Sequence, residues 1–312
     1  MKPSILVGGQ AVIEGVMIRV PGAYSTAVRD SKGKIHLNRE LFTSLTENSN
    51  FWKRPVFRGI ASLFEAMKIG MSTLQWSADI AIPPKENEKE SNRISDFITT
   101  LFSICLAIFL FMIAPMWITT AFLNVEEEVV WFNLISGGFR IIFFVIYLFL
   151  ISLLDDIKRL FQYHGAEHRV VYNFESGMDV TIDNAQSFPT QHPRCGTSFL
   201  FIVLISAIFV FAVVDTIIMS VLGTISLSIR LLSHLPMIPL VSGIGYEVIK
   251  LIAIKDSLVF RLLRNPGLWL QNITTRPPDN EMIEVSITAL KDAFGDKYEE
   301  MVGKEYIAEA IG

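Results

Sequence analysis

Apolar residues are concentrated in the middle of the chain, where they form four long stretches. Three of these stretches hold at most one charged residue, and each is long enough to cross a hydrocarbon core of ~30 Å at a helical rise of ~1.5 Å per residue. The fourth is weaker, because two prolines, a histidine, a glutamate and a lysine interrupt it. The pattern predicts a bundle of about four transmembrane helices, over 97–125, 129–154, 197–229 and 231–254.

The first 50 residues show a different pattern, in which short apolar runs alternate with turn residues such as Pro21 and Gly22. Such a pattern is typical of strands in a small antiparallel sheet. We therefore expect a β-meander in the segment 1–50, with strands over 11–20, 24–29 and 34–38.

Three glycines surround Gln10 and Glu14 within that segment. Glycines clustered in this way indicate a backbone that approaches another segment closely or adopts a positive φ. They do not match the dinucleotide-binding fingerprint, because its spacing and its following helix are absent. We interpret the glycines as bulge positions in the sheet, and we keep Gln10 and Glu14 as candidate site residues.

The segments on both sides of the apolar region are predicted to contain amphipathic helices. From Pro55 to about Ile80 the apolar positions recur with a helical period, which is typical of a helix that lies in the membrane interface or packs on the bundle. Near the C-terminus, Asn280 is placed to cap a helix over 281–294. The expected organisation is a cytoplasmic β-meander (1–50), an interfacial helix with a charged linker at 83–92 (51–96), a transmembrane bundle (97–254) with a polar loop (155–196), and a cytoplasmic segment (255–312).

Composition agrees with a mainly α membrane protein. The chain is 51% hydrophobic and 19% charged, whereas a soluble domain carries about 25% charged residues. Its net charge of −4 excludes a strongly basic nucleic-acid-binding protein, so the expected partners are the lipid bilayer and other membrane proteins. Two cysteines are too few for a scaffold held together by disulfides.

The distribution of lysine and arginine predicts the orientation in the membrane. Thirteen basic residues precede residue 97, four lie in 155–194 and eight follow residue 231, whereas 124–128 holds none and contains three glutamates. We therefore expect a multi-pass protein of the inner (plasma) membrane, with both termini and the long middle loop in the cytoplasm. Cys195 in that loop is then a reduced thiol.

The middle loop contains the residues with candidate chemistry. It holds His164-Gly-Ala-Glu167-His168 and, further on, His192-Pro-Arg-Cys195. His164 and His168 are four residues apart and share one face of a helix, which we take to be the second transmembrane helix running on into the cytoplasm. His192 and Cys195 have the spacing of a metal knuckle. Imidazole and thiolate ligands together favour Zn²⁺.

Two interpretations of this zinc site are open. The HxxEH pattern is that of the inverted zincins, in which both histidines bind Zn²⁺ and the glutamate is a general base, so that Glu167 would be catalytic in a metal-dependent hydrolase. Alternatively, His164, His168, His192 and Cys195 together close a tetrahedral shell, which is typical of structural zinc. The protein would then act without catalysis in the assembly or regulation of membrane proteins.

Three charged residues are predicted to lie inside transmembrane helices. Arg140 and Asp215 fall ~21 Å and ~26 Å from the cytoplasmic ends of their helices. Because intramembrane charges usually pair or line a cavity, we predict an Arg140–Asp215 ion pair. Glu247 lies nearer the cytoplasm and either faces the metal loop, as a ligand or proton relay, or pairs with Lys250. A small transporter that uses these three charges is a further hypothesis.

Five motifs resemble those of the YqhQ-like family of bacterial inner-membrane proteins. They are GGQAVIEGVMIR at 8–19, YHGAEH at 163–168, HPRCGTSF at 192–199, PGLWLQ at 266–271 and TTRPPD at 274–279. The family is of unknown function and is often described as a predicted metal-dependent enzyme. The resemblance implies a multi-pass membrane protein with a cytoplasmic face built from these segments, and it implies no particular substrate.

Overall fold

The computed structural model describes residues 4–82, 93–123, 125–193, 195–254 and 258–308. Its strands are β1 (Ser4–Ile5), β2 (Gly8–Val12), β3 (Gly15–Val20), β4 (Ala23–Arg29), β5 (Ile35–Leu41) and β6 (Ile307–Ala308). Its α-helices are α1 (Leu45–Asn48), α2 (Phe57–Ala81), α3 (Arg93–Ile108), α4 (Ala114–Leu123), α5 (Val129–Ile151), α6 (Asp155–Glu175), α7 (Ile182–Gln186), α8 (Gly196–Leu222), α9 (Leu227–His234), α10 (Ile238–Ile254), α11 (Leu258–Thr274), α12 (Asn280–Phe294) and α13 (Tyr298–Met301). Shorter helical segments are η1 (Phe109–Ile113), η2 (Leu235–Met237) and η3 (Gly295–Lys297). The charged segment 83–92, which we expected to be a linker, lies outside the described residues.

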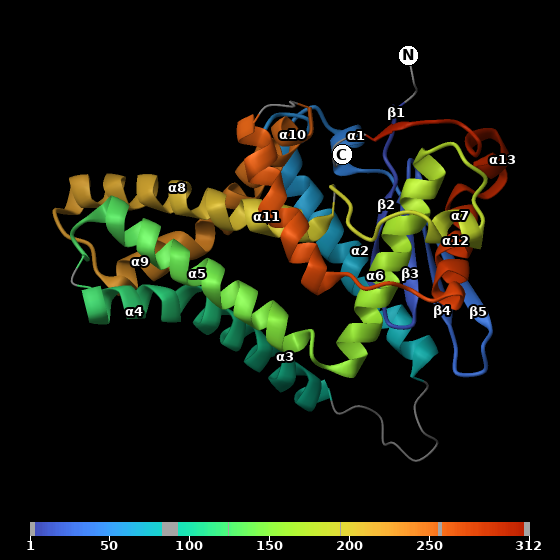
Figure 1. The fold of residues 1–312 in the computed structure, drawn as a ribbon. Coiled ribbons are helices and arrows are strands. Elements are labelled where there is room, and N and C mark those ends of the chain that lie inside the picture. Colours follow the sequence, from blue (N-terminus) through green and yellow to red (C-terminus); the bar gives the residue numbers. More distant parts are fainter. Residues whose placement is uncertain (1–3, 83–92, 124, 194, 255–257, 309–312) are drawn as a thin grey trace.

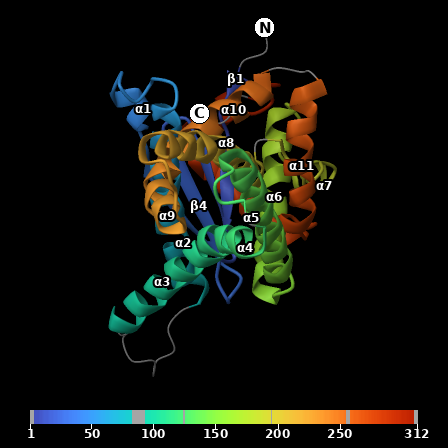
Figure 2. The same ribbon diagram turned by 90° about the vertical axis from the view of Figure 1, so that its left-hand side faces the viewer.

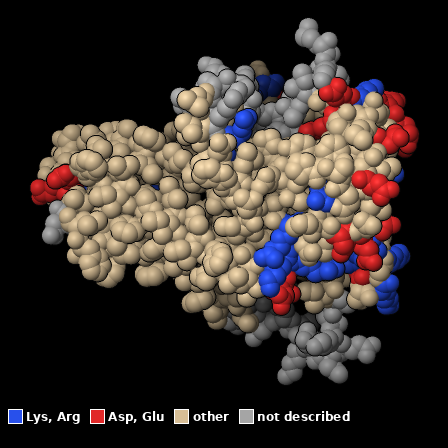
Figure 3. Space-filling view, viewed as in Figure 1, with Lys and Arg blue, Asp and Glu red and all other residues tan. Residues whose placement is uncertain are grey.

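A bundle of long helices lies beside a small sheet that is covered by helices (Figure 1). Four helical segments of the described chain are long and apolar enough to cross a membrane, as predicted: Phe97–Leu123, Val129–Ile151, Gly196–Leu222 and Leu227–Ile252. The fourth is interrupted by a turn of 3₁₀ helix at Leu235–Met237, which explains its weaker pattern. The bundle surface seen in Figure 3 is almost free of charge, with acidic residues at the far tip and basic residues only toward the end of the bundle that adjoins the sheet.

The predicted β-meander is confirmed as a four-stranded antiparallel sheet in the order β2-β3-β4-β5. One strand prediction was wrong, because 11–20 forms parts of two strands, β2 and β3, which are joined by a two-residue turn at Ile13 and Glu14. Glu14 itself has a φ of 52°, which makes the tight turn possible without a glycine.

The glycines are not bulges, since the pairing of β2 with β3 is regular from Gly8 to Val12. Two of them, Gly9 and Gly15, lie instead where backbones approach closely. A Cβ on Gly9 would overlap the carbonyl oxygen of Met17, and a Cβ on Gly15 would overlap that of Ala27.

Helices cover both faces of the sheet, and Figure 2 shows α2 and α6 on opposite sides of the strands. One face, packed against α6 and α12, forms the largest apolar core, which includes Ile18, Phe174 and Leu290. On the other face, Ile69 of α2 packs against Met17 and Tyr24. The helix α2 also contacts α10 and therefore joins the sheet to the bundle.

Two helix boundaries differ from the sequence-based prediction. The second membrane-spanning helix does not run on into the histidine motif, because α5 ends at Ile151 and α6 starts at Asp155 and takes a different direction (Figure 1). Asp155 and Asp156 favour a new helix start, since acidic side chains stabilise the positive end of the helix dipole. At α12 the capping residue is Asp279 rather than Asn280, and its carboxylate accepts a hydrogen bond from the amide of Met282.

Candidate metal centre

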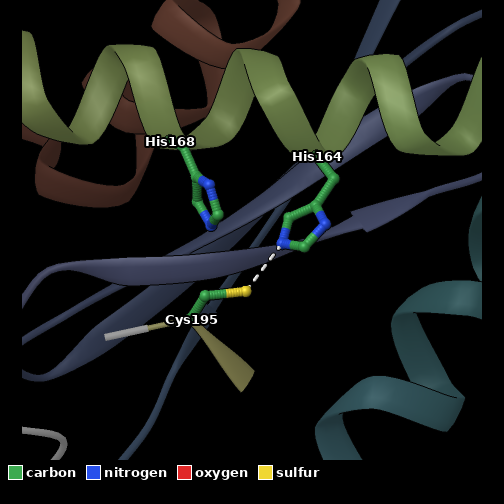
Figure 4. A group of neighbouring side chains, drawn as sticks. All are labelled: His164, His168 and Cys195. Carbon is green, nitrogen blue, oxygen red and sulfur yellow. Dashed lines mark hydrogen bonds between the residues drawn. The ribbon is translucent and has the colours of Figure 1, made fainter. Parts of the chain in front are cut away.

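Three donor atoms of the kind that bind zinc converge from α6 and from the residue before α8. His164 and His168 project from one face of α6 toward Cys195, the residue that precedes α8 (Figure 4). One ligand atom from each of the three residues lies within 4.8 Å of the others. The sulfur is 3.2 Å from Nε2 of His164, and both His168 and Cys195 are buried. The group has the spacing and burial that a single metal ion requires.

Both imidazole rings are held in the orientation of a metal ligand. Nδ1 of His164 lies 2.8 Å from the carbonyl oxygen of Thr274, and Nδ1 of His168 lies 2.5 Å from that of Thr190. A carbonyl oxygen can only accept, so each Nδ1 donates its proton to a carbonyl and each Nε2 is the nitrogen that faces the candidate metal position. Metal-binding histidines in proteins usually have this second contact. The residues therefore fit a zinc ion.

Gly165 allows one of these carbonyls to reach its histidine. A Cβ at this position would overlap the carbonyl oxygen of Arg276, so the chain before α12 can lie directly against α6 only if residue 165 lacks a side chain. This contact positions Thr274 beside His164. The close approach of the Arg276 carbonyl thus explains why the HGAEH motif has a glycine at position 165.

His192 lies next to the three donors but is directed elsewhere. Its ring centroid is 5.5 Å from that of His168, and its Nε2 is 3.7 Å from a carboxylate oxygen of Glu175. Its backbone is fixed by Gln271, whose side chain accepts from the His192 amide at 2.6 Å and donates to its carbonyl at 2.8 Å. Among the described residues, the group with metal-ligand spacing consists of His164, His168 and Cys195.

Glu167 lies beside the donors at the wall of a cavity. It is 4% exposed, and one carboxylate oxygen is 3.4 Å from Nε2 of His168. The cavity has a volume of about 270 Å³ and is also lined by the three donor residues. Its other walls come from β2, α2, α8 and α10, and they include Gln10, Leu63, Phe199 and Tyr246. A carboxylate, three soft ligands and an accessible volume therefore occur together.

Burial and charge act in opposite directions on the pKa values of the site. Burial disfavours a charged imidazole, but the neighbouring Cys195 sulfur outweighs it and raises the pKa of His164 to about 9. Burial likewise disfavours a thiolate, but His164 and His168 hold the pKa of Cys195 well below its usual range. In the metal-free site, a negatively charged sulfur therefore lies next to a positively charged ring. A bound metal cation would take over the role of that positive charge.

The predicted Arg140–Asp215 ion pair was wrong. Nε of Arg140 donates to the carbonyl oxygen of Phe111 at 2.8 Å. Asp215 instead lies 3.1 Å from Nε of Arg230 and 2.7 Å from Nε2 of His234. Similar depth in the membrane does not ensure contact, because the two side chains must also face each other around their helices.

The other three candidate residues have structural contacts. Glu247 does not belong to the group of candidate metal ligands. Its carboxylate accepts a hydrogen bond from Arg58 at 2.7 Å, so Arg58 rather than Lys250 is its hydrogen-bond partner. Gln10 donates to the hydroxyl of Thr73 at 2.8 Å and lines the cavity. The carboxylate of Glu14 pairs with Arg159 and so attaches the β2–β3 turn to α6.

Comparisons with known proteins give a family but no activity. A family model described as "Protein of unknown function (DUF1385)" matches residues 54–296. The chain is 32% identical over 301 residues to a Bacillus subtilis (strain 168) protein described as "Uncharacterized protein YqhQ", and the alignment covers 91% of each chain. No solved structure gives a significant match.

Proposed function

The chain belongs to the DUF1385 family, and we propose that it is a membrane-embedded, zinc-dependent hydrolase with its site at the cytoplasmic face of the membrane. The observation that carries this proposal is the three-donor group beside the buried carboxylate of Glu167. Zinc sites with three protein ligands keep a position open for chemistry, whereas structural sites are closed by four. The geometry therefore favours the catalytic interpretation over structural zinc.

Each residue of the centre has a distinct part in this proposal. His164, His168 and Cys195 would hold the ion, which when bound supplies a Lewis acid that polarises the bond to be cleaved. Glu167 would accept the proton of the attacking water and pass it to the leaving group. The buried position of Glu167 keeps it close to the ligands and away from bulk solvent.

The cytoplasmic orientation of the site is part of the proposal. The far tip of the bundle shows acidic but no basic residues in Figure 3, whereas basic residues gather next to the sheet. This distribution agrees with the rule that positive residues stay on the cytoplasmic side. A phosphatase reporter inserted at residue 126 should be active outside the cell membrane, and a fluorescent protein at the C-terminus should be active inside. The reverse pattern would contradict the orientation.

Exchange of Glu167 for glutamine tests the hydrolase directly. Glu167→Gln should retain zinc and folding but lose hydrolysis and genetic complementation, because the amide cannot accept the proton. Asp156→Asn, which alters an exposed carboxylate at the start of the same helix, is the matched control and should behave as wild type. Full activity of Glu167→Gln with zinc bound would remove Glu167 as the base.

A second candidate function follows from the 3.2 Å approach of the Cys195 sulfur to Nε2 of His164. A thiolate at a helix N-terminus beside an imidazole is also the arrangement of a cysteine nucleophile. Chelation distinguishes the two functions. A zinc hydrolase loses activity when the metal is removed and regains it with Zn²⁺, whereas a cysteine hydrolase stays active in the chelator and is inactivated by thiol alkylation.

A further inference from the structure

We propose that the substrate of this site is an extended, apolar segment of polypeptide that pairs as an additional strand with the edge strand β2. This inference rests on the proposed hydrolase function and adds its substrate class. Three observations support it: the free edge of β2, the position of that edge in the cavity, and the apolar lining of that cavity.

The strand β2 is at the edge of the sheet and has one side without a partner strand. Val12 pairs with Gly15 across the two-residue turn, so hydrogen-bonded pairs alternate from there along the hairpin. Gly9 and Ala11 then direct their backbone N–H and C=O groups away from β3. Within the described parts of the chain, no other segment forms a hydrogen bond to these outward groups. An exposed edge of this kind is a template for an incoming strand.

The free edge and the candidate metal centre share one cavity. Five consecutive residues, from Leu6 to Gln10, line it together with His164, His168 and Cys195. Gly9 is exposed, and the place where its Cβ would be is 3.2 Å from Cγ of Glu167. The side chain of the proposed base therefore packs against the backbone of Gly9, the residue whose amide would pair with a peptide carbonyl.

The surroundings of the edge select for an apolar extended chain. Figure 1 shows that β2 is the strand nearest to the membrane-spanning helices, and Figure 2 shows α2 and α6 on either side of the strands. The cavity at this edge is lined mainly by apolar groups, including Leu63, Ala66 and Phe199. Such a cavity favours a single strand with small or apolar side chains. Segments of this kind occur where a polypeptide chain leaves the membrane.

The reaction proposed is hydrolysis of a peptide bond in that strand. The oxygen of water bonds to the carbonyl carbon, the C–N bond breaks, and the proton taken up by Glu167 passes to the leaving nitrogen. The products are a carboxylic acid and an amine, which exchange one proton to become a carboxylate and an ammonium group, so neither an oxidant nor a reactant other than water is needed.

A scan of N-methylated substrates tests the strand pairing. Zinc-loaded protein in nanodiscs is first incubated with a library of quenched fluorescent apolar peptides, and a cleaved peptide is then resynthesised with one N-methyl group at each position in turn. Pairing with β2 predicts an alternating result, in which every second N-methyl group slows cleavage by about tenfold or more and the positions between are tolerated. Uniform tolerance or loss without alternation would overturn the pairing.

Photo-cross-linking provides a readout that does not depend on turnover. A peptide carrying a benzophenone group should label residues 6–10 or Leu63 in the Glu167→Gln variant, and an unlabelled copy of the peptide should compete. Labelling elsewhere only would overturn the inference.

Phospholipid and fatty-acyl ester substrates separate failure of the inference from failure of the hydrolase. Zinc-dependent cleavage of lipid esters without cleavage of any peptide would overturn the peptide substrate and leave the hydrolase standing. Cleavage of neither class by folded, zinc-loaded protein would overturn both.

Discussion

Replacement of Asp215 by leucine is expected to destabilise the membrane bundle strongly. The Asp215 carboxylate is fully buried and contacts Arg230, His234 and the amide of Asn133, the last at 2.7 Å. Without it, the guanidinium of Arg230, which is 1% exposed, keeps the carbonyl oxygen of Glu126 as its remaining hydrogen-bond acceptor. Removing one partner of a buried pair costs about 3–5 kcal/mol, which lowers the ratio of folded to unfolded protein by about two to four powers of ten.

The double variant Asp215→Leu/Arg230→Met tests the cause of that loss. It removes both charges and should be more stable than Asp215→Leu alone by about 2 kcal/mol or more. The free energy of unfolding can be measured by circular dichroism during titration of the micelle-bound protein with sodium dodecyl sulfate. Arg140→Leu in the Asp215→Leu background is the matched control and should give no relief. Relief by Arg140→Leu, but not by Arg230→Met, would refute the assignment of the ion pair.

Two further predictions concern the metal centre. Gly165→Ala should weaken zinc binding and lower stability, because its Cβ displaces the chain at Arg276; Gly138→Ala, whose Cβ would meet nothing within 4 Å, should be neutral in zinc titration and thermal unfolding. In metal-free protein, the raised pKa of His164 contributes to the free energy of unfolding at low pH, and this contribution is lost as the pH rises from 6.5 to about 9. The lowered pKa of Cys195 has the opposite effect, because its contribution to the free energy of unfolding increases as the pH rises toward 9.0. The excess stability of wild type over Cys195→Ser should therefore stay level across this window and decrease at more acidic pH; a maximum at acidic pH would contradict the thiolate–imidazolium pair.

The membrane bundle could be predicted from sequence because the length and apolarity of a span are local properties. Even the fourth segment, which is interrupted near Pro236, shows enough apolar length. The β2–β3 turn could not be predicted in the same way. Glu14 adopts a positive φ with no glycine in the turn, so 11–20 shows no signal that separates the two strands.

The candidate metal ligands were predictable where helical spacing alone brings them together. His164 and His168 are on one face of α6, as their separation of four residues requires. The local pairing of His192 with Cys195 was less informative, because Gln271 fixes the backbone of His192 from a distant helix. The carbonyl oxygens of Thr190 and Thr274, which orient the two imidazoles, belong to backbone positions that no sequence motif marks.

Counting residues along a helix gave the depth of the intramembrane charges but not their direction. Arg140 and Asp215 have comparable depth, yet Arg140 faces the backbone of Phe111 in η1. The partners of Asp215, Arg230 and His234, come from α9, the short helix that follows α8 after a turn. Arg230 and His234 are polar residues at the start of the weakest apolar stretch. This position is the sequence signal that could have identified them as partners of Asp215.

The coordination of zinc in the purified protein tests the central claim most directly. Metal analysis combined with X-ray absorption spectroscopy should find one zinc ion per chain, with two nitrogen ligands and one sulfur ligand from the protein and a fourth ligand that is exchangeable. Cys195→Ser should lose the sulfur ligand, and His192→Ala should leave the spectrum unchanged. A spectrum with three nitrogen ligands and one sulfur ligand that changes in His192→Ala, or a protein that binds no zinc, would contradict the three-ligand hydrolase.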